Sequence, residues 1–160
     1  QYQLLFPIQQ ENPLSLNILQ TLHLEDRYEA DFHDVYRSRN DSETTMNIIL
    51  SHIPAYVEYW DPITWKNGEK KWGAFIRERY EPYFSRYNIN LMISGHQHNY
   101  QRGTSPKSNV TYIITGGAGG ELDDQQVENY GFYEKTHITH HYGILTCHLN
   151  KKEIQWEAYT

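Results

Sequence analysis

The chain has 160 residues, which is enough for one ordinary domain, and its hydrophobic content of 38% is low for a compact one. Fourteen Lys and Arg residues against twenty Asp and Glu residues give a net charge of −6, which argues against general binding to nucleic acid or acidic membrane surfaces. The single cysteine, Cys147, excludes an internal disulfide framework. Histidine is over-represented, with nine residues, so the histidines are the residues to follow.

The first third of the chain is predicted to contain a strand, a helix and a loop. We expect a short strand over residues 2–9, ended by the turn residues Asn12 and Pro13. Apolar residues at helical spacing predict an amphipathic helix over residues 25–38, and polar residues predict a loop over 38–45.

An apolar run at residues 46–50 opens the middle of the chain and is typical of a strand buried on both faces of a sheet. We predict an aromatic loop over residues 55–71. The next segment, 72–87, has apolar residues at three- and four-residue spacing and predicts an amphipathic helix. Pro82 lies inside this pattern, and we expect it to kink the helix or start a new one.

The last part of the chain is predicted to be mostly strand. Residues 89–94 and 110–115 are apolar runs, and residues 142–149 and 153–159 alternate as a hairpin. Strands interrupted by helices and followed by a hairpin indicate a layered α/β domain with a mixed sheet.

Two of the predicted strands end in the same way, with a small residue followed by histidine. His52 follows the strand 46–50, and His96 and His98 follow the strand 89–94. A helix between two strands is typical of a crossover unit, in which parallel strands bring their carboxyl ends to one edge of the sheet. We therefore expect the three imidazoles to come together as a transition-metal site. The alternative is that they only bond to backbone groups at the strand ends.

Other polar groups near these strand ends have two interpretations each. His137, His140 and His141 are either solvated loop residues or groups that reach the site, where a histidine could protonate a leaving oxygen. Glu121, Asp123 and Asp124 are either a polar turn or additional metal affinity. The glycine-rich segment 116–120 lacks the residues of a P-loop, and we expect it to let the backbone pass close to the site.

The motifs at these positions resemble a known family when they are taken in order. The segments His52-Ile53-Pro54-Ala55-Tyr56 and Gly95-His96-Gln97-His98-Asn99-Tyr100-Gln101-Arg102 are similar to the last two motifs of the calcineurin-like metallophosphoesterases. The segments 112–120 and 142–145 are most similar to the purple acid phosphatase branch. The resemblance covers residues 46–159 and implies the C-terminal half of a layered α/β/β/α sandwich with mixed sheets.

The resemblance also implies an activity and a set of site residues. His52 and His96 would bind one metal of a two-metal centre and His98 the other, the metals being Fe, Zn or Mn. The family hydrolyses phosphate esters by attack of a metal-activated hydroxide. His140 and His141 are candidate acids, and Tyr56, Lys66 and Tyr100 are candidate substrate-binding residues. The alternative for the aromatic loop 55–71 is that it covers the edge of the sheet.

The family's N-terminal half supplies the motifs Asp-x-His, Gly-Asp-x-x-(Asp or Tyr) and Gly-Asn-His, which we interpret as missing here. We expect residues 1–160 to be the C-terminal portion of a domain, inactive alone, whose N-terminal half belongs to the same precursor or to a separate chain. The alternative is a degenerate, non-catalytic subunit with a structural or binding role. Sequons at Asn40 and Asn109 permit a glycoprotein and weakly favour a secreted or lysosomal location.

Overall fold

A computed structural model of the protein describes residues 16–21, 46–148 and 153–160. The predicted strand 2–9, helix 25–38 and loop 38–45 lie outside these residues. A strand that the sequence pattern did not indicate, β1 (Leu16–Thr21), is the first described element.

Most of the elements predicted from residue 46 onward are confirmed. The strands are β2 (Met46–Ser51), β3 (Ile89–Ser94), β5 (Thr111–Thr115), β7 (Tyr142–His148) and β8 (Glu153–Tyr159). Helix α3 (Lys70–Arg79) is followed at once by α4 (Glu81–Phe84). Pro82 lies in the first turn of α4, where a missing amide donor is tolerated, so the new-helix interpretation is correct.

The strands form a six-stranded mixed sheet and a separate two-stranded one. The order in the larger sheet is β1-β2-β3-β5-β4-β6, in which the first four strands run parallel and β4 runs antiparallel to both of its neighbours. Among the strands that the structure describes, β7 and β8 pair with each other and with no other strand. Because β2 and β3 are parallel neighbours, the segments that follow them leave the same edge of the sheet.

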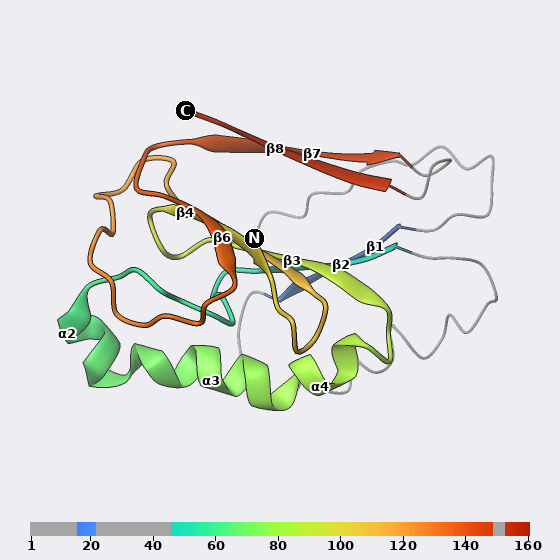
Figure 1. Ribbon diagram of the computed structural model, residues 1–160, viewed down its shortest axis with the longest axis horizontal. Coiled ribbons are helices and arrows are strands. Elements are labelled where there is room, and N and C mark those ends of the chain that lie inside the picture. The colour runs from blue at the N-terminus through green and yellow to red at the C-terminus, as the bar shows by residue number, and fades with distance from the viewer. Residues whose placement is uncertain (1–15, 22–45, 149–152) are drawn as a thin grey trace.

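The molecule has three layers, with the helices on one face of the large sheet and the β7–β8 hairpin on the other (Figure 1). Adjacent residues of a strand point to opposite faces, so each central strand serves two cores. Ile49 and Met92 pack toward Phe84 on the helical side, while Ile48 and Leu91 pack on the hairpin side. The second core is completed by Leu145, Cys147, Ile154 and Trp156 of the hairpin. The layered α/β class with a mixed sheet is thereby confirmed.

The aromatic segment 55–71 is only partly a loop, which corrects the prediction. From Pro62 onward the segment is mostly helical, in α2 (Pro62–Thr64) and the π-helical turn η1 (Trp65–Glu69), with a kink at Gly68, whose φ is 140°. Asp61 accepts hydrogen bonds from the backbone N–H and the hydroxyl of Thr64, both at 2.7 Å. The Asp-Pro pair that looks like a turn in the sequence is therefore an N-cap followed by proline in the first helical turn.

Two strands of the large sheet were not predicted. They are β4 (Tyr100–Thr104) and β6 (Tyr133–His137), and both are rich in polar residues. Strand β6 lies at the edge of the sheet, where a polar strand with Glu134 and Lys135 exposed is expected. No helix within the described ranges is long and apolar enough to cross a bilayer.

Candidate metal centre

His52 and His96, which are 44 positions apart, meet beyond the carboxyl ends of β2 and β3. The Nε2 atom of His52 lies 3.1 Å from the Nδ1 atom of His96, and the ring centroids are 4.8 Å apart. Two nitrogens held at about 2.0–2.1 Å from one tetrahedral zinc ion lie about 3.3 Å apart. The separation of the two imidazole nitrogens thus fits ligation of a single ion, although their role as ligands stays a prediction.

His96 occupies an unusual backbone conformation. Its φ of 67° lies in the left-handed region, and the N–H of Gln97 donates to the carbonyl oxygen of Gly95 at 2.8 Å across it. This is the strained form of a γ-turn, and a residue other than glycine in such a region costs about 1–3 kcal/mol. Strain of this kind clusters at functional sites, because the surrounding structure must be built to hold it.

His98 is oriented by the segment that follows the glycines. Its Nδ1 atom lies 2.8 Å from the carbonyl oxygen of Glu121, and since a carbonyl can only accept, Nδ1 carries the proton. The Nε2 atom is then the basic nitrogen, as in metal-binding histidines whose other nitrogen donates to a carbonyl. The backbone N–H of His98 donates to the carboxylate of Asp123 at 2.7 Å. Glu121 and Asp123 therefore both hold His98 in place.

The glycine-rich segment passes close to the 96–98 loop, as predicted. A Cβ added at Gly116 would lie 2.2 Å from the carbonyl oxygen of Gln97. A Cβ at Gly120 would lie 2.3 Å from the His98 ring, while one at Gly119 would meet nothing within 4 Å. The absence of side chains at Gly116 and Gly120 is what gives the histidine loop its room.

A chain of buried amides, which sequence reasoning missed, fixes the loops around this site. The Gln101 amide accepts from the backbone of Glu58 at 3.4 Å and donates to the side chain of Asn99 at 2.8 Å. Asn99 in turn donates to the carbonyl oxygen of Asp123 at 3.1 Å. Gln97, Asn99 and Gln101 are each fully buried. Their alternation directly after His96 was the available signal, since amides at every second position of a strand share one face.

Gln97 differs from the other two amides. Neither its oxygen nor its nitrogen has a hydrogen-bond partner within the described part of the chain. A buried polar group in this state costs about 1–3 kcal/mol. Gln97, which bears this cost, lies between His96 and His98 in the sequence.

Two tryptophan side chains, Trp60 and Trp65, lie near His96. The Trp60 ring contacts the His96 ring edge-on at 4.7 Å between centroids, and buried Trp65 lies 6.3 Å behind it. The backbone N–H of Trp60 donates to the carbonyl oxygen of Gln125 at 2.8 Å, which ties this loop to the segment after the glycines. Lys66 is exposed on the following helical turn. Trp60 thus lies beside the candidate site, and the covering of the sheet edge by this segment stays a prediction.

His140 and His141 lie against the glycine segment from the other side. His141 is buried, with Nδ1 3.0 Å from the carbonyl oxygen of Thr139 and Nε2 3.0 Å from the Thr115 hydroxyl. Both nitrogens of His141 are therefore engaged. His140 is exposed and donates through Nδ1 to the carbonyl oxygen of Gly117 at 3.0 Å, which leaves its Nε2 atom the better placed for proton transfer.

Tyr56 and Tyr100, the two tyrosines proposed to bind substrate, lie in the interior. Tyr56 is 7% exposed and its hydroxyl donates to Glu81, while Tyr100 is 6% exposed and its hydroxyl accepts from the indole N–H of Trp156 at 3.1 Å. Both hydroxyls thus have protein partners, and the role of these tyrosines in binding a substrate stays a prediction.

The described residues do not complete a metal site. Within the ranges that the structure covers, no three side chains of the metal-ligating types come together. The sequence also corrects one interpretation made above, because an Asp-x-His triplet is present at Asp31-Phe32-His33. These three residues lie outside the described ranges.

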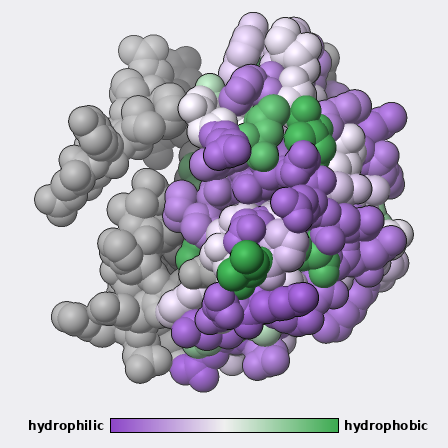
Figure 2. All heavy atoms as spheres, turned by 90° about the vertical axis from the view of Figure 1, so that its left-hand side faces the viewer, coloured by the Kyte–Doolittle hydropathy of each residue, from purple (hydrophilic) through white to green (hydrophobic). Residues whose placement is uncertain are grey.

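The end of the molecule on which α2 lies has a hydrophilic surface. Figure 2 shows this side, and its coloured atoms are mostly those of hydrophilic residues, with a few small, separate hydrophobic spots. A surface of this kind suits a polar, charged solute better than a large apolar partner.

Comparison with known proteins shows sequence similarity to purple acid phosphatases. A purple acid phosphatase of Glycine max is 33% identical over 91 residues, 57% of this chain and 18% of that protein. Purple acid phosphatase 5 of Arabidopsis thaliana is 31% identical over 97 residues, 61% of this chain and 22% of that protein. The Fe(3+)-Zn(2+) purple acid phosphatase 12 of Arabidopsis thaliana is 31% identical over 91 residues. No family model matches the chain.

Solved structures share the fold. The purple acid phosphatase PPD1 of yellow lupin (Lupinus luteus) has a TM-score of 0.61 at 18% identity, covering 82% of this chain and 26% of that one. GAP50, described as the anchor in the inner membrane complex of Plasmodium, has a TM-score of 0.50 at 12% identity, covering 78% of this chain and 39% of that one. The matched segment spans only about a fifth of the length of the curated relatives.

Proposed function

We propose that this chain, a purple acid phosphatase-like member of the calcineurin-like metallophosphoesterases, contributes the second part of an active site that hydrolyses phosphate esters. The observation that carries the proposal is the 3.1 Å approach of His52 and His96 at the carboxyl ends of two parallel strands. The motifs that carry the resemblance lie in the same place.

The donor set suits a transition metal. His52 and His96 offer two neutral imidazoles at a separation compatible with one ion, and His98 offers its Nε2 atom for a second. When bound, two such cations would activate water and neutralise charge on the phosphoryl oxygens. Iron, zinc and manganese are the proposed metals, and one similar plant enzyme carries Fe(3+) and Zn(2+) in its name.

The residues of this chain have distinct roles in the proposal. The strained turn at His96 and the Glu121 carbonyl aim the imidazoles before any metal binds. The exposed Lys66 can pair with a phosphate, and Trp60 offers a face to an organic leaving group. His140, when protonated on both ring nitrogens, can deliver the Nε2 proton to the leaving oxygen and keep its Nδ1 hydrogen bond to Gly117.

We further propose that the remaining ligands come from residues outside the described part of the chain. Two imidazoles are fewer than the three protein ligands typical of catalytic zinc. On this proposal residues 1–160 are the C-terminal portion of a longer domain, and the N-terminal portion belongs to the same precursor or to a partner chain. A secreted or lysosomal location and glycosylation belong to the same proposal.

The experiment combines metal analysis with turnover of p-nitrophenyl phosphate by the complete protein that contains this chain. We expect two bound transition metals, and we expect His98→Ala to lower kcat by orders of magnitude. The matched control is His137→Ala, which removes an exposed imidazole on the edge strand β6 and should leave kcat unchanged.

Two results would overturn the proposal. An unchanged rate in His98→Ala would show that the 96–98 motif does not serve the reaction. A complete protein without bound metal and without turnover would support the alternative, a fold relative retained as a structural or binding subunit.

A further inference from the structure

Helices α3 and α4, which connect β2 to β3, contact the loop that follows β2. Gly73 and Arg77 are four residues apart in α3 and so lie on one face of that helix, and Glu81 is the first residue of α4. A Cβ added at Gly73 would lie 2.9 Å from the carbonyl oxygen of Ala55, so α3 touches this backbone directly. Arg77 donates a hydrogen bond to the same oxygen, and its guanidinium lies over the Tyr56 ring, 5.1 Å from the centroid.

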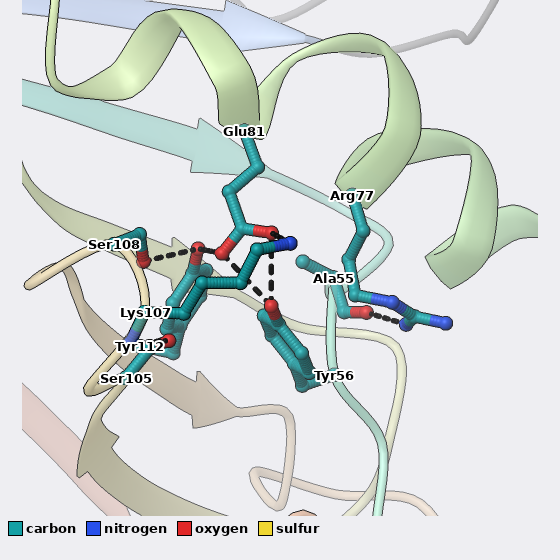
Figure 3. Close-up of polar contacts among 8 residues, drawn as sticks. All are labelled: Ala55, Tyr56, Arg77, Glu81, Ser105, Lys107, Ser108 and Tyr112. Carbon is teal, nitrogen blue, oxygen red and sulfur yellow. Dashed lines mark hydrogen bonds and ion pairs between the residues drawn. The ribbon is translucent and has the colours of Figure 1, made fainter.

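Glu81, the last of these three residues, is the centre of a buried cluster of polar side chains (Figure 3). Its residue is 5% exposed, and the Tyr56 hydroxyl lies 2.8 Å and 2.9 Å from its two carboxylate oxygens. The Tyr112 hydroxyl of β5 donates to the same carboxylate at 2.9 Å. Lys107 lies 3.8 Å away, but its side chain is 79% exposed, so it adds little.

The hydrogen bonds of the cluster match the two acceptor oxygens of the Glu81 side chain. Burial raises the pKa of Tyr56 above its ordinary value, and Glu81 raises it further; burial also raises the pKa of Tyr112. Both hydroxyls are therefore donors at neutral pH. A carboxylate has two acceptor oxygens for two donors, whereas a glutamine amide has only one and presents N–H groups on its other side.

Tyr56 connects this cluster to His52. The intervening residues are held closely, since Pro54 and Ala55 are buried and the Ser51 hydroxyl donates to the carbonyl oxygen of Ile53 at 2.8 Å. His52 itself is exposed, and its ring contacts the ring of His96 on the adjacent strand end. Its placement beside the adjacent strand end also depends on how firmly residues 53–56 are held.

We propose that Glu81 is a positioning residue that sets His52 against His96 by holding the 53–56 loop through the Tyr56 hydroxyl. Its role in catalysis rests on the proposed function, but the contact between the two histidines does not. Tyr56 and Tyr112 provide a matched pair, because each donates one hydroxyl to the same carboxylate from a different element. Only Tyr56 belongs to the histidine loop.

The test compares Tyr56→Phe, Glu81→Gln and Tyr112→Phe in the complete, metal-free protein with isotope-labelled histidine. The first readout is the nuclear Overhauser effect between the His52 and His96 ring protons, whose ring centroids are 4.8 Å apart. We expect this signal to be lost in Tyr56→Phe and Glu81→Gln and retained in Tyr112→Phe. The second readout is Co²⁺ affinity, which should weaken about tenfold in the first two variants and stay at the wild-type value in the third.

The free energy of unfolding, measured for each variant, separates positioning from general stability. Loss of the histidine signal in proportion to lost stability across all three variants would overturn the proposal, as would a retained signal in Glu81→Gln. A wild type that shows the histidine contact but binds no Co²⁺ would contradict the proposed function and leave the positioning role supported by the first readout.

Discussion

His52 Nε2 and His96 Nδ1 face each other at 3.1 Å, so in the metal-free molecule one of these nitrogens supplies the proton that the other accepts. A metal ion held by both atoms would have to displace that proton. The hydrogen bond between the two histidines and the binding of one metal ion therefore need the same two nitrogen atoms. The two states compete, and this competition can be measured.

The pair should behave as one functional unit. We expect His52→Ala and His96→Ala each to lower kcat for p-nitrophenyl phosphate by orders of magnitude in the complete protein, and the double variant to be little worse than either. The reason is that residues which serve one ion lose their joint effect when the first is removed. Fully additive losses, measured by steady-state kinetics, would show that the two imidazoles act separately.

Gly120→Ala should displace the His98 ring, because the added Cβ would lie 2.3 Å from it. We expect the affinity for Zn²⁺ to fall at least about tenfold, as when an orienting partner of a metal ligand is lost. The matched control is Gly119→Ala, whose Cβ enters open space. Isothermal titration of both variants checks the prediction, and equal affinities would contradict the close packing around His98.

The helical core predicts a large loss of stability for Phe84→Ala. Phe84 is 1% exposed and packs against the sheet, so truncation should lower the free energy of unfolding by about 3–5 kcal/mol. Ile63→Ala, at a residue that is 70% exposed, should change it by less than about 0.5 kcal/mol. Urea unfolding monitored by circular dichroism distinguishes the two variants. A small effect at Phe84 would mean that α4 packs loosely.

Stability should fall at alkaline pH because of the buried tyrosines. Burial raises the pKa of Tyr112 well above its ordinary value of 10, so above pH 10 the unfolded chain loses a proton that the folded state keeps. Stability is therefore full below pH 10 and declines above it, by about 1.4 kcal/mol per pH unit for each such tyrosine. Tyr112→Phe should lessen this slope in unfolding curves collected between pH 9 and pH 12. An unchanged slope would show that Tyr112 ionises normally.

The sequence predicts those parts of the fold in which one local signal dominates. The apolar runs that become β2 and β3 are buried on both faces, and Pro82 can only begin or break a helix, so both features could be read directly. The meeting of His52 and His96 was predictable as well, because the position of a residue just after a parallel strand fixes the sheet edge at which it lies.

The parts that could not be predicted depend on partners distant in sequence. Strand β4 is polar, and Gln101 is buried there only because Asn99 and the Glu58 backbone complete its hydrogen bonds. Glu81 looks like a surface residue of an amphipathic helix until the tyrosines from two other elements reach it. Local patterns carry no information on such contacts, so buried polar residues are where sequence reasoning fails.

The hairpin β7–β8 has no backbone hydrogen-bonded pairing with the larger sheet, so within the described residues side chains alone attach this layer. Leu145 and Trp156 pack on the face that Ile48 and Ile113 present. A two-stranded hairpin is marginal by itself, whereas strands in the interior of a parallel sheet open only with the whole fold. The amide protons of β7 and β8 should therefore exchange with solvent through a separate, lower-energy opening, in which the hairpin lifts from the sheet and leaves the crossover helices in place.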